Sequence, residues 1–430
     1  MATSRAAAMT RRAASAPRIQ FRAMSMMPTF EEFPGVPATT PSPTSASTTT
    51  VSTVGGLTIA TESSARTSTV SLTMPGGGSA SEALGESGSS LASRFLTFKS
   101  SATQSSLATL RMLEDAGAES FAAAGRTSAV VGYSGAPEVA AERSLLAALV
   151  ADVAHERWDV RDALKTAAYV RGKALADPHA LLTDKIYGAA FGALSPLGRS
   201  FYASGASFEG VAAFRQRTYG TEGAILVATG VPDHSAFVAA AAEAFALAGA
   251  GDPTVPPSEY LGGEERVSAD GYSHAHLALA FPAPSDPVAA AVLKRCIDVA
   301  GGPDVSAFSS PELIGAYGLA GSAQSTALVD SLVGALRAPT ADVFDTAVAL
   351  AKGDALLQQD DSRALADAMT AGLAATGAYD QGAVAAAYDA VTAQDVAAAA
   401  AEMVGSPLSV AAAGDLGAIP HHSAISGAFS

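Results

Sequence analysis

One segment of the chain occurs twice, and the spacing of its two copies constrains the fold more than any other feature. The first copy is Ser207–Gly230, and the second, more diverged copy is Thr392–Gly414. Aligning Val211 with Val396 gives an offset of 185 positions (396 − 211), which is close to half of the 430 residues. A repeat at such a spacing predicts two similar domains in tandem.

Both copies predict the same local structure. Ser207 and Thr392 favour the N-cap of a helix, because their hydroxyl groups accept hydrogen bonds from free backbone N–H groups. Gly220 and Gly405 occupy equivalent positions and predict the end of that helix. A short apolar strand follows the glycine in each copy. Chance similarity in an alanine-rich chain is the alternative, but cap, stop and strand occur in the same order in both copies.

Length and composition narrow the class of protein. A chain of 430 residues exceeds the size at which one core stops growing, so two domains of about 200 residues are expected. The net charge of −15 argues against nucleic acid or anionic lipid as the main partner. The most apolar run, Ala236–Ala248, contains Glu243 and predicts a packed helix rather than a membrane span. Cys296 is the single cysteine, which excludes an internal disulfide, and its apolar helical surroundings predict a buried thiol.

The N-terminal region differs in composition from the rest of the chain. Residues 1–30 contain five arginines and neither Asp nor Glu, which is typical of an organelle transit peptide. A disordered basic tail is the alternative. Removing this leader changes the net charge from −15 to about −20 (−15 − 5), so leader and body have opposite electrostatics. Residues 31–49 are rich in Pro, Ser and Thr and predict an extended arm.

The remaining chain divides at a stretch rich in Gly and Pro. We predict an N-terminal domain at 50–247, a linker at 248–263 and a C-terminal domain at 264–425. Strands expected at 56–60 and 67–74 would form a hairpin or meander, followed by a strand at 127–132 and a helix at 137–154. In the second half, strands are expected at 276–281 and 313–319 and helices at 325–336, 341–359 and 361–373. Strands and helices do not alternate strictly, which favours an α+β fold.

The segment Thr50–Ser101 resembles a known family. Two strands, a Gly-rich turn and a helix followed by Phe98-Lys99-Ser100-Ser101 are similar to the inverted-zinc-motif metallopeptidases of the pitrilysin and mitochondrial processing peptidase type. In that family the helix carries His-x-x-Glu-His, with Phe-Lys-Gly-Thr three residues later. The resemblance places this box on Leu91–Phe95, and it implies two homologous α+β domains of the LuxS/processing-peptidase-like fold.

The residues at the box cannot perform the family's chemistry. Leu91 and Phe95 replace the zinc-binding histidines, and Arg94 replaces the catalytic Glu. Zinc requires N, O or S donors, and arginine is not deprotonated in proteins. Thr166–Ala176, where the family's third ligand is expected, contains no carboxylate. We therefore predict no catalytic residue, no cofactor, no metal and no enzymatic activity, with Leu91 and Phe95 forming an apolar i, i+4 pair.

Within the family, the chain resembles the core protein 2 group of respiratory complex III. Tyr260–Glu264 carries the most specific match, supported by Arg157–Val160 and Asp177-Pro178. The resemblance implies a non-catalytic core subunit of ubiquinol–cytochrome c reductase that supports assembly and stability. Its implied place is the matrix side of the mitochondrial inner membrane, which it joins only through the complex. The implied partners are a core-1-like sister subunit, cytochrome b, cytochrome c1 and the Rieske protein. The resemblance implies that the redox centres of the complex are held by other subunits and that this chain carries none.

Two alternatives remain. The first is the presequence-recognising, non-catalytic α-subunit of the processing peptidase, which carries a long Gly-rich loop where this chain has the short Ala300–Pro303. The second is an active metalloenzyme with a relocated site. His155 and Asp159 are four apart on an expected helix, and His274 and His276 share one strand face. Neither pair has a third donor nearby in the sequence, so we interpret the first as surface residues and the second as ordinary strand residues.

Overall fold

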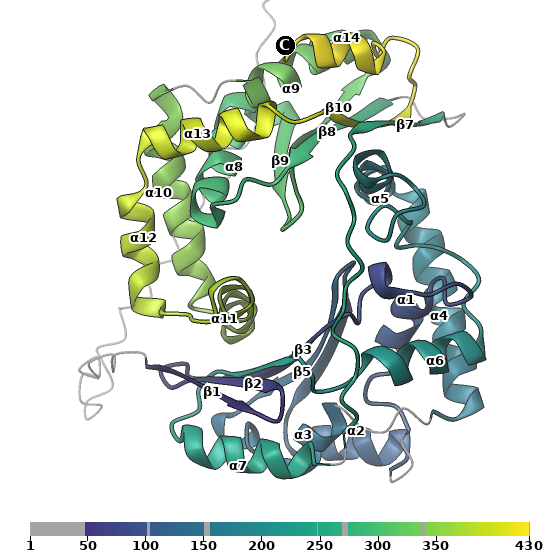
Figure 1. Cartoon of the computed structure of the whole chain (residues 1–430), viewed down its shortest axis with the longest axis vertical. Helices are drawn as coiled ribbons and strands as arrows, with labels where there is room; N and C mark the ends of the chain where they lie inside the picture. Colours follow the sequence, from purple (N-terminus) through teal and green to yellow (C-terminus); the bar gives the residue numbers. More distant parts are fainter. Residues whose placement is uncertain are drawn as a thin grey trace, which may run out of the picture. The chain divides into compact units, whose positions relative to one another are not determined.

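The structure is a computed structural model that describes residues 48–100, 104–149, 155–246, 248–268, 274–337 and 341–429. The predicted transit peptide at 1–30 lies outside the described residues, as does nearly all of the predicted arm at 31–49. Ala46–Ser430 form one compact unit that contains two β-sheets and the helices that cover them (Figure 1).

The first sheet has six strands in the order β1-β2-β6-β3-β5-β4. Their bounds are β1 Thr49–Val54, β2 Leu57–Glu62, β3 Ser68–Pro75, β4 Glu119–Ala124, β5 Ser128–Gly135 and β6 Ile225–Ala228. Neighbouring strands are antiparallel except β2 and β6, which are parallel. The expected hairpin of the strands near 56–60 and 67–74 is therefore wrong, because β6 inserts between β2 and β3. The apolar β6 buries nearly all of its side chains in this central position.

The second sheet has five strands in the order β7-β11-β8-β10-β9. Their bounds are β7 Gly263–Ser268, β8 His274–Pro282, β9 Val305–Ser309, β10 Leu313–Gly321 and β11 Ser409–Gly414. Strands β7 and β11 are parallel, and the other neighbours are antiparallel. Apart from β1, the first sheet has the same order and directions, with β6 in the position of β11. The α+β prediction is thus confirmed, and the two copies of the repeated segment occupy equivalent positions.

Helices occupy the same intervals between the strands in both halves. The first half contains α1 Ser89–Arg94, α2 Ser106–Asp115, α3 Arg143–Leu149, α4 Arg157–Ala176, α5 Pro178–Phe191, α6 Phe208–Thr218 and α7 His234–Ala244. The second half contains α8 Pro287–Gly301, α9 Ser325–Arg337, α10 Ala341–Gln358, α11 Ser362–Thr376, α12 Val384–Ala390, α13 Ala393–Val404 and α14 His422–Gly427. The helix expected at 137–154 begins later than predicted, because Pro137–Val139 form a 3₁₀ turn first.

The repeated helices begin as the sequence predicts. Helix α13 also ends at the predicted glycine, with Gly405 as its C-cap, whereas the C-cap of α6 is Tyr219, one residue before Gly220. Ser207 Oγ accepts a hydrogen bond from Gly210 N at 3.0 Å at the start of α6. Thr392 forms a reciprocal capping box with Asp395 at the start of α13. At the other ends, Gly405 has a φ of −66°, so it does not use the left-handed conformation of a C-terminal glycine. Gly220 is required for space, since a Cβ atom there would lie 2.3 Å from the Ala250 carbonyl oxygen.

Helices α5 and α11 occupy equivalent positions in the two halves, and each packs against the sheet of the other half. Helix α5 packs against β7, β8 and β11 of the second sheet, and α11 packs against β3 and β6 of the first (Figure 1). Leu182 and Ile186 of α5 lie in one apolar cluster with Ala278 of β8, and Leu365 and Met369 of α11 lie in another with small residues of the first sheet. Each half therefore completes the core of the other. No described helix is long and apolar enough to cross a membrane.

Candidate functional site

Helix α1 carries the first four of the five positions that correspond to the zinc box, and its C-cap residue Phe95 is the fifth. Leu91 is 2% exposed and packs in an apolar cluster with Leu96, Val160 of α4 and Val211 of α6. Phe95 lies against the same cluster with its side chain partly buried. The two positions that hold zinc ligands in the peptidases are thus used for core packing, as the sequence predicted.

Arg94 ties α1 to the edge of the first sheet. Its Nε donates a hydrogen bond to the carbonyl oxygen of Ala122 on β4 at 2.9 Å, and its guanidinium lies 5.5 Å from the centre of the Phe95 ring. Strand β4 is the last strand of the sheet, so this carbonyl lies at an otherwise unpaired edge. A cation that donates to a backbone carbonyl cannot take a proton from water, which excludes Arg94 as a general base.

A buried cation lies behind α1. Arg215 of α6 is 4% exposed, and its Nη1 donates to the Ser93 carbonyl oxygen at 3.1 Å. The guanidinium also lies 4.1 Å from the centre of the Tyr219 ring. No carboxylate among the described residues pairs with Arg215, and burial lowers its pKa. The adjoining cavity, lined in part by Arg215 and His155, has a volume of only about 10 Å³, too small for any substrate.

His155 and Asp159 both contact Ser100. His155 Nδ1 lies 3.1 Å from the Ser100 carbonyl oxygen, so this nitrogen carries the proton, and the Asp159 carboxylate accepts from the Ser100 hydroxyl. His155 Nε2 is buried and has no hydrogen-bond partner among the residues that the structure describes. Burial first, and then the charge of Arg215, lower the pKa of His155 to about 4. The expected helical position is therefore wrong, because His155 precedes α4. Its side chain is partly buried rather than fully exposed at the surface.

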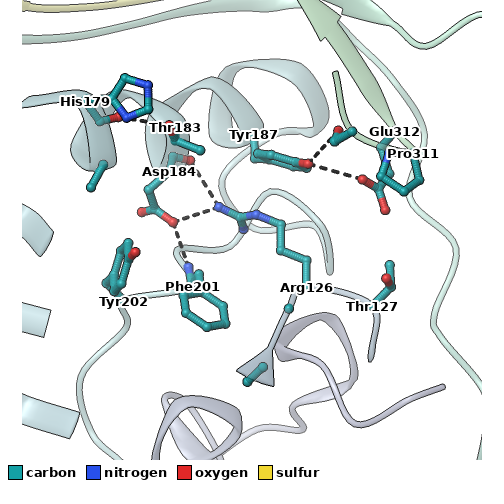
Figure 2. Close-up of a pocket in the computed structure, with 14 residues that line it drawn as sticks. Arg126, Thr127, His179, Thr183, Asp184, Tyr187, Phe201, Tyr202, Pro311 and Glu312 are labelled. Atoms are coloured by element: carbon teal, nitrogen blue, oxygen red, sulfur yellow. Dashed lines mark hydrogen bonds and ion pairs between the residues drawn. The ribbon is translucent and has the colours of Figure 1, made fainter. Parts of the chain in front are cut away.

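A network of polar side chains lies in a cavity of about 540 Å³ (Figure 2). It is lined by the β4–β5 turn, α5, the loop that follows α5 and the turn between β9 and β10. Arg126 stands at its centre, and its Nη2 lies 2.7 Å from Asp184 Oδ1. Nη1 donates to the carbonyl oxygens of Leu197 and Arg199 at 3.0 and 2.6 Å. The Arg126 guanidinium also stacks 4.1 Å from the centre of the Tyr187 ring.

Asp184 and Tyr187 form further hydrogen bonds at this cavity. Asp184 accepts from Ser200 Oγ at 2.5 Å and from Phe201 N at 2.8 Å. Tyr187 donates from its hydroxyl group toward Ser310 Oγ at 2.9 Å and Glu312 Oε2 at 3.2 Å, and burial raises its pKa to about 12. This network joins α5 to the β4–β5 turn on one side and to the β9–β10 turn on the other. These buried contacts therefore stabilise the packing of α5 against both turns.

The remaining candidates have structural roles. His276 Nδ1 lies 2.7 Å from the Tyr317 hydroxyl on the neighbouring strand β10. Cys296 is buried in the core under the second sheet, as predicted, and burial raises its pKa to about 11. Across the described ranges, no group of three His, Cys, Asp or Glu side chains is arranged to hold a metal ion. The absence of zinc stays a prediction.

Comparison with known proteins identifies the fold. No family model matches the chain, and no curated protein matches it. Among solved structures, a chain of complex III2 from Candida albicans, bound to Inz-5, superposes with a TM-score of 0.74 at 16% sequence identity. The match covers 88% of this chain and 99% of that chain. The two chains thus share one fold over nearly the full length of the complex III2 chain, which confirms the predicted resemblance at the level of structure.

Proposed function

We propose that this chain is a non-catalytic core subunit of mitochondrial complex III. The observation that carries the proposal is the structural match over 99% of a complex III2 chain, found in a protein whose zinc box is filled by Leu91, Arg94 and Phe95. A large fold that has lost its catalytic groups is retained for its surfaces, and obligate interfaces commonly bury about 2,000 Å² or more.

In this role the chain supports assembly and stability of the ubiquinol–cytochrome c reductase and carries no redox centre. Its partners are a core-1-like sister subunit together with cytochrome b, cytochrome c1 and the Rieske protein. It lies on the matrix side of the inner membrane and is attached through these partners. Residues 1–30 direct import and are removed, 31–49 form an arm, and 50–247 and 264–425 are the two peptidase-like domains on either side of the 248–263 linker.

The decisive experiment is native electrophoresis of solubilised mitochondria with mass spectrometry of each band. The chain should migrate with cytochrome b and cytochrome c1 in a haem-containing particle far heavier than its own 42.8 kDa. Migration with a zinc-containing processing peptidase subunit, free of haem, would instead assign it as the presequence-recognising α-subunit.

Metal analysis tests the non-catalytic part of the proposal separately. After dialysis, the purified chain should contain far less than one zinc per molecule, because neither Leu91 nor Phe95 offers a donor atom. One tightly held zinc per chain would show that a relocated metal site exists and that the subunit is not merely structural.

A further inference from the structure

Helices α4 and α6 are neighbours (Figure 1). A groove with a volume of about 520 Å³ lies between α4 and the beginning of α6. Its apolar floor is formed by Val160, Leu164 and Ala168 of α4 and by Phe208 of α6. Residues spaced four apart lie one above the other on a helix, so the three α4 side chains form a continuous row. The groove can therefore accept a complementary row of apolar side chains along the axis of α4.

A second row of α4 side chains forms a basic wall beside this floor. Arg157, Arg161 and Lys165 are exposed, line the groove and are also spaced four apart, so they extend over about 12 Å. Arg161 and Lys165 approach Asp162 only at 3.5 and 3.6 Å, and all three side chains are exposed. Exposed pairs of this kind contribute little, so the cations remain available to a partner.

Arg157 is the first cation of the basic wall. Its guanidinium lies 5.3 Å from the centre of the Phe208 ring, and within the described part of the chain it forms no ion pair. The acid among the lining residues is Glu209. Three cations therefore face a single carboxylate within the groove.

The basic wall contrasts with the rest of the protein. The chain has a net charge of −15, whereas α4 contains five basic and two acidic residues. Two aromatic residues of α4 are also well exposed, Trp158 at 57% and Tyr169 at 63%. Trp, Tyr and Arg are the residue types enriched at the energetic centres of protein interfaces.

We propose that this groove binds an amphipathic helix of a partner protein. The apolar row of that helix enters the floor, and a neighbouring row of carboxylates, spaced four residues apart, faces Arg157, Arg161 and Lys165. The charge pattern supplies complementarity, and a hollow between two helices fits a ridge of helical side chains. An anionic bilayer fits less well, because the net negative charge repels it and a recessed floor cannot reach a flat surface. This inference does not depend on membership of complex III.

The test uses the full purified chain and a designed helical peptide of about 18 residues, or five turns. The peptide carries Leu every fourth residue and Glu every fourth residue in the adjacent row, is free of Trp, and bears a fluorescent label. A control peptide has Gln in place of each Glu. Fluorescence anisotropy measures affinity, and emission of Trp158, the single tryptophan, reports on the same helix without a label.

We expect saturable binding of the Glu peptide, much weaker binding of the Gln peptide, and loss of the difference at about 1 M salt, where the Debye length is about 3 Å. Arg161→Glu should weaken binding by about tenfold or more, since it reverses the central charge of the wall. Lys173→Glu is the matched control, because it makes the same charge change on the same helix but does not line the groove. Circular dichroism verifies that both variants are folded.

Equal affinities for the Glu and Gln peptides, or equal effects of the two variants, would overturn the proposal. A parallel arm uses vesicles of phosphatidylcholine with and without phosphatidylserine. Binding to the phosphatidylserine vesicles that depends on Arg161, with no peptide binding, would reject the protein helix in favour of a lipid surface.

Discussion

Replacement of Asp184 tests whether the network of Figure 2 holds the fold together. The Asp184 side chain is 2% exposed and the Arg126 side chain 11%, with 2.7 Å between Arg126 Nη2 and Asp184 Oδ1. Removing one partner of a buried ion pair costs about 3–5 kcal/mol, because the other charge is left unpaired. Arg126 keeps its two carbonyl acceptors, so we expect Asp184→Ala to lower the free energy of unfolding by about 3 kcal/mol, the lower end of this range.

A surface ion pair of the same length provides the control. Arg143 Nη1 and Glu243 Oε1 also lie 2.7 Å apart, but their side chains are 63% and 60% exposed. Glu243→Ala should therefore cost less than about 1 kcal/mol. Asp184→Asn is a third variant: it keeps the shape but can turn an NH₂ group toward the Phe201 N–H donor, so it should be destabilising as well.

Urea unfolding of the full chain, followed by far-ultraviolet circular dichroism, measures these differences from the midpoint and slope. Because Arg126 follows β4 of the first sheet while α5 covers the second sheet, Asp184→Ala should also broaden the transition or split it in two. If Asp184→Ala changes the unfolding free energy no more than Glu243→Ala does, the assignment of a structural role to this network is refuted.

Three further predictions concern pH and helix caps. The pKa of His155 is about 4 in the folded chain and 6.5 when unperturbed, so the unfolded chain binds a proton more readily. The free energy of unfolding should therefore fall by up to about 3 kcal/mol as pH decreases from 6.5 to 4. His155→Asn should remove this loss in urea unfolding. Burial, opposed by backbone hydrogen bonds, raises the pKa of Glu82 to about 7. Ionisation of Glu82 should therefore destabilise the fold as pH rises from 4.5 through 7. Glu82→Gln should reduce the dependence of the unfolding free energy on pH, measured by urea unfolding between pH 5 and 8. Thr392→Ala and Ser207→Ala should each cost about 1 kcal/mol in thermal or urea unfolding, whereas a loss below the error of measurement would show that the caps are dispensable.

The sequence predicts the repeated architecture well because its signals are local. The N-cap hydroxyls of Ser207 and Thr392 act within one helical turn, and both form the expected bonds. The apolar i, i+4 pair Leu91 and Phe95 follows from helical spacing alone. The positions of β6 and β11 in their sheets are equivalent, although the strand order itself could not be read from the sequence.

Contacts between distant segments could not be predicted. Apolar burial has no direction, so the apolar faces of α5 and α11 do not reveal that each covers the sheet of the other half. Arg126 and Asp184 are 58 positions apart, and nothing local in the sequence pairs them. The same holds for His155, whose partner Ser100 lies 55 positions away. Its four-residue spacing from Asp159 looks helical in the sequence, but α4 begins only at Arg157.

Helix α1 is stabilised by side chains at both of its ends. A helix of six residues is not stable by itself, because its few hydrogen bonds do not offset the unfavourable free energy of helix nucleation. At its beginning, the Glu82 carboxylate accepts from Gly88 N at 2.9 Å and Ser90 N at 2.8 Å. At its end, Arg215 donates to the Ser93 carbonyl oxygen. An acid at the N-terminus and a cation at the C-terminus both complement the helix dipole, which explains why Arg215 is tolerated in the core without a carboxylate. Because burial raises the pKa of Glu82 to about 7, the charge at the first end depends on pH.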